Sequence, residues 1–141
     1  MTTQANISNF KFYLGTTASP QVLAAMEEVI SVSGVGKTNN LVDVTNFDSA
    51  AGTREFIAGL ADGEEFTVEC NYLPKATVQI NAMSSVDSGL NKKAKLSYLG
   101  NSPIKNWAFD VVCMGYTVAP SATEQNRLTL TYKISGAIVR T

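Results

Sequence analysis

The chain has 141 residues, of which 11 are basic and 12 acidic, so its formal net charge is −1. Charged residues make up 16% of it, against about 25% in typical soluble domains. This balance excludes a global attraction to nucleic acid or to an anionic membrane, and no apolar stretch approaches the roughly 20 residues of a membrane span. We expect one domain over residues 1–141, made in the cytosol, with part of its surface hidden against a partner.

Alternating apolar and polar residues predict strands along most of the chain. The clearest are residues 66–72 and 127–135, and shorter examples cover residues 10–14, 41–45 and 94–99. Residues 107–118 are apolar on both faces, which is typical of a strand between two layers or beneath an interface, and Gly115 suggests a bulge there. For residues 22–33 we expect a helical turn or loop after Pro20, followed by a strand that ends near Gly34.

One helix is expected over residues 75–87, after Pro74 and before a closing Gly89. Its apolar stripe would face the core and consists of Ala76, Ile80, Met83 and Val86. The sequence therefore predicts a mainly β protein, a sandwich or partly closed barrel with one flanking α-helix.

The connection between the strands at 41–45 and 66–72 is unusually long for a compact domain. It carries several large apolar side chains, which disfavours disorder: Phe47, Phe56, Ile57 and Leu60. We expect residues 46–63 to form an ordered arm or hairpin whose apolar face meets something outside its own domain.

Catalytic chemistry is poorly represented. The chain has no histidine, so the common nucleophilic pairs and zinc sites are excluded. Asp43, Asp48 and Asp62 lack the loop pattern of a calcium site, and the glycines at 34 and 36 lack the spacing of a phosphate loop. We expect no enzyme activity, cofactor or metal, and two reduced cysteines, Cys70 and Cys113, with a disulfide between them as the minor alternative.

Opposite charges occupy different parts of the sequence. Residues 43–69 hold seven of the twelve acids and one base, while residues 75–105 hold five of the eleven bases and one acid. Chance and two solvated faces explain this equally well, but head-to-tail contact between copies is the sharper hypothesis. The candidates for contact between copies are Phe47, Arg54, Glu55, Phe56, Ile57, Leu60, Asp62, Lys92, Lys93 and Lys95.

Three consecutive segments resemble the signature region of the phage tail tube (major tail) proteins of long-tailed phages. They read LVDVTNFDS at 41–49, REFIAGLADG at 54–63 and EFTVECNY at 65–72. The expected helix and the closing strand also lie where that family has them. The specific part of the resemblance covers about thirty residues of the chain.

The resemblance implies a tail tube fold whose subunits form hexameric rings that stack into a hollow tube. It implies that the 46–63 arm bridges neighbouring copies, and that residues 1–9 are a flexible arm that orders on stacking. The implied partners are further copies, an initiator or baseplate and a terminator, with DNA passing through the lumen during ejection. The implied location is the tail of a virion.

A tube that conducts DNA should not hold it, so a neutral or acidic lumen is preferable to a basic one. The polar face of the 65–72 strand supplies the lumen candidates: Glu65, Thr67, Glu69 and Asn71. One alternative is the inner tube of a contractile injection or secretion machine. Another is a monomeric β-sandwich that binds a ligand through Trp107, Tyr116 and Tyr132.

Overall fold

A computed structural model describes residues 10–16, 21–99 and 104–141 and shows a mainly β protein with one helix. Residues 1–9, the expected N-terminal arm, lie outside this description. Seven strands form one antiparallel sheet in the order β2-β1-β7-β8-β9-β6-β3, and two more, β4 and β5, form a separate hairpin. The strands of the sheet are β1 (Phe10–Gly15), β2 (Leu23–Ala25), β3 (Val29–Ser33), β6 (Glu65–Asn71), β7 (Asn91–Tyr98), β8 (Lys105–Ala119) and β9 (Arg127–Arg140).

The large sheet curls around its own core, and we call it, together with the helix, the body. Phe12 on β1 contacts Phe66 on β6 and Tyr132 on β9, with ring centroids 6.0 and 5.9 Å apart. Those strands belong to opposite halves of the sheet, so the inner faces of the two halves pack against each other. The sheet does not close into a barrel, because β2 and β3 are the two ends of the strand order. The expected sandwich-like, mainly β architecture is confirmed.

Strict alternation of buried apolar and outward-facing polar residues explains why β6 and β9 form strands at the centre of the body. Phe66, Val68 and Cys70 are buried, and they lie in register with Tyr132, Leu130 and Leu128 of β9, which are buried as well. The intervening polar residues face outward. Burying one face in this way fixes the register, since a slip by one residue would expose the whole apolar set.

Strand β8 does not lie between two layers of its own chain, so of the two expected alternatives only a position beneath an interface stays open. Its register with β9 shifts between Cys113 and Gly115, which confirms the bulge. Phe109, Val111 and Cys113 are buried, but Met114 and Tyr116 are 47% and 42% exposed. Within the chain, β8 is therefore covered on one face only.

The segment before β3 contains a short strand, β2, where a helical turn or loop was expected. Residues Leu23–Ala25 pair with β1 instead, and a tight turn at Glu27 and Glu28 leads into β3. Glu28 adopts a left-handed backbone conformation (φ 50°), which reverses the chain there. β3 itself, ending at Ser33, is confirmed.

The helix α1 (Thr77–Ser88) lies where the sequence predicted it, and Gly89 closes it with φ 69°. Its expected apolar stripe is confirmed in part, because Ala76 is buried and Met83 and Val86 pack against the core. Val78, Gln79, Ala82 and Ser85 face the core, while Ile80 is 44% exposed. The apolar periodicity did not predict the whole buried face, because two polar side chains, Gln79 and Ser85, are also buried. Both donate hydrogen bonds to backbone carbonyls.

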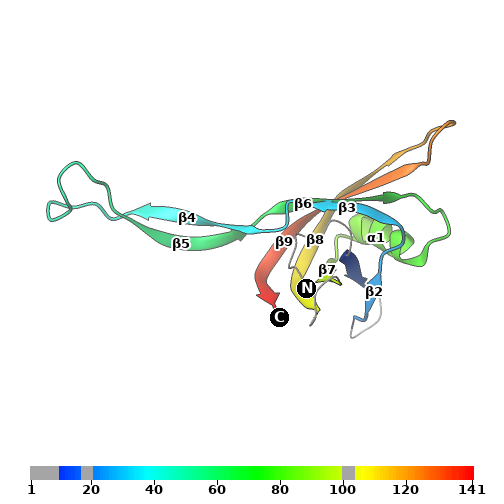
Figure 1. Cartoon of the computed structure of the whole chain (residues 1–141), viewed down its shortest axis with the longest axis horizontal. Helices are drawn as coiled ribbons and strands as arrows, with labels where there is room; N and C mark the ends of the chain where they lie inside the picture. The colour runs from blue at the N-terminus through cyan, green and yellow to red at the C-terminus, as the bar shows by residue number, and fades with distance from the viewer. Residues whose placement is uncertain (1–9, 17–20, 100–103) are drawn as a thin grey trace, which may run out of the picture.

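Strands β4 (Lys37–Asp43) and β5 (Phe56–Gly63) form a hairpin that projects far from the body, as Figure 1 shows. We call residues 37–63 the arm. The arm starts earlier than the expected residue 46, because the strand expected at 41–45 belongs to it and not to the large sheet.

Candidate subunit interface

The arm is an isolated two-stranded hairpin. Val42 lies opposite Ile57, and Asp43 opposite Phe56, while no third strand of the described chain pairs with either edge. Two-stranded hairpins are at best marginally stable in water without a layer that covers them. Among the described residues, no third strand or other layer covers the arm.

Apolar side chains are exposed on both faces of the arm. Adjacent residues of a strand point to opposite faces, so the Val42 and Ile57 pair lies on one face and Leu41 and Phe56 lie on the other. Leu60 is 84% exposed. Large apolar patches that stay exposed in this way mark interaction surfaces in soluble proteins.

The tip of the arm is ordered by its own polar groups. The backbone N–H of Thr45 donates to Asp43 Oδ1 at 2.9 Å, and the N–H of Glu55 donates to Thr45 Oγ1 at 2.8 Å. Hydrogen bonds from the side chain and the backbone N–H of Thr45 hold the pKa of the Asp43 carboxyl below its usual value. The next turn is closed by the N–H of Asn46, which donates to Ser49 Oγ at 3.0 Å. The closed tip presents Phe47 fully exposed to solvent.

The root of the arm is fixed to β9. Gly63 packs so closely on Ile134 that no side chain fits there. Lys133 Nζ donates to the Gly63 carbonyl at 3.0 Å and lies 3.4 Å from Asp62 Oδ1. These contacts set the direction in which the arm leaves the body.

The structure gathers most of the predicted contact residues on the arm. Its tip or strands carry seven of them, all exposed: Phe47, Arg54, Glu55, Phe56, Ile57, Leu60 and Asp62. Lys93 and Lys95 lie apart from them, on β7 of the body.

Lys92 requires a correction. Its side chain is only 3% exposed, and its Nζ donates to the Thr16 carbonyl at 3.4 Å. The alternation of β7 places it on the inner side with Ala94 and Leu96, so it does not share a surface with Lys93 and Lys95. It cannot contact a second copy in this fold.

Lys93 and Lys95 belong to a positively charged surface that the sequence did not reveal. Lys11 on β1 is exposed on the same outer face, since its neighbour Tyr13 is in register with Lys95. Lys95 Nζ lies 4.3 Å from the centroid of the Tyr13 ring. We call Lys11, Tyr13, Lys93 and Lys95 the basic face.

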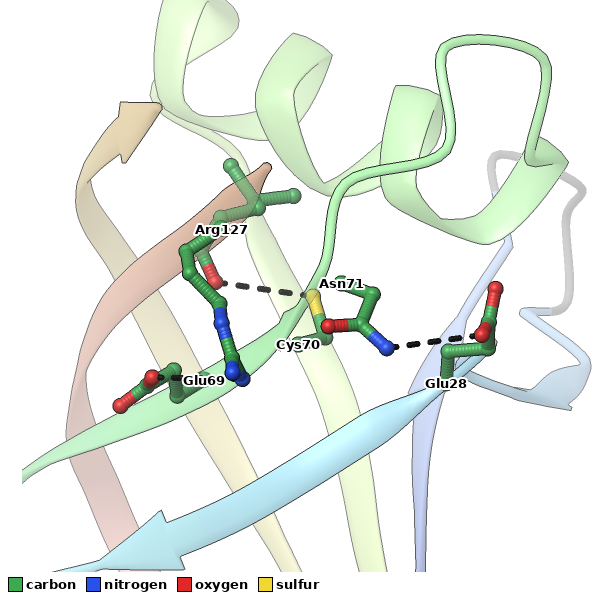
Figure 2. A network of polar contacts seen from close by, with 6 residues as sticks. Glu28, Glu69, Cys70, Asn71 and Arg127 are labelled. Carbon is green, nitrogen blue, oxygen red and sulfur yellow. Dashed lines mark hydrogen bonds and ion pairs between the residues drawn. The ribbon is translucent and has the colours of Figure 1, made fainter. Parts of the chain in front are cut away.

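The lumen candidates lie together on the outer side of β6, and β9 supplies a neighbour for each. Thr67 pairs with Thr131 and hydrogen-bonds Ser33 at 2.8 Å, and Glu65 lies opposite Lys133. In Figure 2, Arg127 reaches Glu69 at 3.8 Å.

Asn71 donates to Glu28 Oε1 at 3.5 Å in the same view. We call this surface the hydroxyl face; its members are Ser33, Glu65, Thr67, Glu69, Asn71, Arg127, Thr129, Thr131 and Lys133. It holds two acids and two bases, so it is neutral, and the sequence reasoning found only its β6 half.

Both cysteines are buried and unbonded, on strands β6 and β8, which β9 separates. Burial raises the pKa of Cys70 and of Cys113 to about 11, so neither is a reactive thiolate near neutral pH. In the described part of the chain, no three acidic or thiol side chains gather to hold a metal. No helix among the described residues is long and apolar enough to cross a membrane.

Solved structures share this architecture over nearly the whole chain. A chain from the C6-symmetric tail of an empty gene transfer agent particle has TM-score 0.79 and 17% identity, covering 98% of this chain and 99% of that one. A chain of the SPP1 tail tube has TM-score 0.74 and 8% identity, with coverage of 94% and 76%. This chain has a tail tube fold.

A third similar structure comes from an extracellular contractile injection system, at its sheath/tube terminator in the extended state. Its TM-score is 0.73 at 13% identity, covering 99% of this chain and 98% of that one. No protein-family model matches the sequence, and no curated protein does. The tail tube fold therefore occurs both in phage-like tails and in contractile machines.

Proposed function

We propose that this protein is the structural subunit of a phage-type tail tube, that it has no catalytic role, and that it works by assembling with copies of itself. The observation that carries the proposal is the arm, which is ordered at its tip and fixed at its root yet apolar on two uncovered faces. In a subunit that worked alone, these side chains would be a liability for aggregation. In a tube they are the contacts that join copies.

Six copies form a ring in this proposal, and rings stack into a tube. The tail tube fold supports this arrangement, since a similar chain belongs to a tail with C6 symmetry. The partners are further copies, together with the baseplate or initiator and the terminator at the two ends of the tube. The location is the tail of a virion, after synthesis in the host cytoplasm.

The hydroxyl face lines the lumen in this arrangement, with Glu65, Thr67, Glu69 and Asn71 contributed by β6. Each phosphate that a protein neutralises adds affinity for DNA, so a conducting surface should carry little uncompensated positive charge. Pairing of Glu69 with Arg127, and of Asp62 with Lys133, removes such charge. DNA can then pass during ejection without being held.

A second candidate is the inner tube of a contractile injection or secretion machine. The observation that favours it is the similarity to a chain from a sheath/tube terminator. In that case the outer surface of the tube would bind a sheath, whereas the contacts between copies would be the same.

Sedimentation of the purified protein over a range of concentrations tests the proposal. We expect a ring-sized species or longer polymers to grow at the expense of the monomer as the concentration rises. A protein that remains monomeric up to its solubility limit contradicts the proposal.

A further inference from the structure

The basic face is electrostatically unsatisfied in the isolated chain. Lys93 and Lys95 lie two residues apart on one face of β7, and Lys11 lies on the neighbouring strand beside Tyr13. Asp110, opposite Lys93, is the acid that the register brings to this group. No ion pair joins Lys11, Lys93 or Lys95 to an acid within the described residues, so these side chains can pair with a partner of opposite charge.

The arm carries the complementary charge. Its outer half, residues 41–58, holds three acids and one base: Asp43, Asp48, Glu55 and Arg54. All four are exposed, and the carboxylates of Asp48 and Glu55 make no hydrogen bond or ion pair within residues 10–16, 21–99 and 104–141. These two groups are therefore free to meet a base on another molecule.

The arm cannot reach the basic face of its own chain. It projects away from the body in Figure 1, and Gly63, Asp62 and Lys133 fix its root. The partner of the arm is thus a different molecule. Since each chain carries one arm and one basic face, contact between them is heterologous and can continue from copy to copy.

The curl of the sheet places the basic face suitably for this contact. Phe12 on β1 meets Phe66 on β6 across the core, so the outer faces of the two halves point in opposite directions. One half carries the hydroxyl face and the other the basic face. An arm that docks on the basic face leaves the hydroxyl face free.

Resting on the proposed function, we propose that the basic face is the docking surface for the acidic tip of the arm of a second copy. The exposed Phe47 and the Tyr13 ring give this contact an apolar centre. Asp48 and Glu55 meet Lys93, Lys95 and Lys11 around it. Complementary charge selects which surface the arm binds and fixes its register.

Charge reversal on each side tests the proposal. The arm variant is Asp48→Lys with Glu55→Lys, and the face variant is Lys93→Glu with Lys95→Glu. Each should raise the concentration at which polymers appear by at least about tenfold, because like charges then oppose each other at the contact. The fourfold variant, which restores opposite charges, should assemble as the wild type does.

Mixing the arm variant with the face variant gives a more specific test than either variant alone. In a mixture in which the two variants alternate, the unaltered acidic arm of the face variant meets the unaltered basic face of the arm variant. The arm variant's own arm meets the face variant's reversed face with opposite charges, so the mixture should polymerise while neither component does alone. The control, Lys75→Glu with Lys105→Glu, removes two exposed lysines outside the basic face and should assemble normally.

Two results would overturn the proposal. One is normal assembly of either double variant, and the other is failure of both the fourfold variant and the mixture to assemble when circular dichroism shows folded chains. Binding of duplex DNA by the wild-type monomer that is lost in the face variant would assign the surface to nucleic acid and also exclude the proposal. Whether the wild-type protein assembles at all tests the proposed function, independently of where the arm docks.

Discussion

Gln79 shows how one polar side chain holds the body together. It is fully buried on α1, and its Nε2 donates to the carbonyls of Glu27 and Asn71 at 3.1 and 2.8 Å. Its Oε1 accepts from the N–H of Leu73 at 2.9 Å. One side chain thus satisfies backbone groups from the turn before β3, the end of β6 and the segment that leads into α1.

Replacing Gln79 by Leu should therefore destabilise the protein strongly. The substitution keeps the size of the side chain but leaves buried backbone groups without partners, and each such group costs about 1–3 kcal/mol. We expect the free energy of unfolding in urea to fall by roughly 3 kcal/mol or more. The same change at the exposed Gln125 should stay within about 0.5 kcal/mol, and equal unfolding midpoints for the two variants would refute this role.

The buried cysteines make the stability depend on pH in a defined direction. Because their pKa is raised from 9.0 to about 11, the unfolded chain releases these protons first as the pH rises. Burial likewise raises the pKa of Tyr132 well above its ordinary value. The contribution of the two thiols to stability is therefore fully present below pH 9.0 and is lost between pH 9.0 and about 11.

A variant with Cys70→Ala and Cys113→Ala checks this dependence. Urea unfolding at about pH 8 and about pH 10 should show a smaller loss of unfolding free energy for the variant than for the wild type. All other side chains are identical in the two proteins, so the difference reports on the two thiols and on their effect on Tyr132. Equal losses would mean that the thiols do not contribute.

At the scale of elements, the proposed assembly gives the arm a role that depends on other copies. Phe47 at its tip and Leu60 on β5 are exposed and contribute to no core cluster of the chain. Replacing both by Ser should leave the folded body intact, because nothing in it packs against them. In the assembly, the same change removes two apolar contacts from each copy.

We expect the Phe47→Ser, Leu60→Ser variant to unfold in urea like the wild type while losing assembly in sedimentation experiments. Ile80→Ser is the matched control, since Ile80 is an exposed apolar residue on α1, away from the arm. Unimpaired assembly of the Phe47→Ser, Leu60→Ser variant, or an equal defect in the control, would show that the arm does not join copies.

Sequence reasoning located most elements because their signals are local. The alternation of apolar and polar residues in β6 and β9 reflects the burial of one face of each strand. It can be recognised in each strand without knowledge of its partner. It could not assign the strand around Val42 to the arm, since strand pairing depends on residues far apart in the chain. It could not find the basic face either, because Lys11 and Lys95 meet only through the pairing of β1 with β7.

The burial of polar side chains is the other feature that the sequence did not predict. Gln79 and Lys92 lie inside the body because carbonyl groups from distant segments accept their hydrogen bonds. The periodicity of apolar residues does not show which distant carbonyl groups will accept these hydrogen bonds. For Lys92 one local signal did exist, since it alternates in phase with Ala94 and Leu96.

On the scale of the whole molecule, the curl of a single sheet separates three surfaces. The hydroxyl face, the basic face and the arm point in different directions, so one copy can contact others and still leave a neutral surface free. This separation is what a subunit of a conducting tube needs.

Electron microscopy of the concentrated wild-type protein tests the central claim most directly. We predict uniform hollow tubes or rings whose end-on class averages have six-fold symmetry, with density for the arm reaching from one copy to the next. Compact single particles without a central channel, at concentrations where sedimentation shows no larger species, would contradict the account.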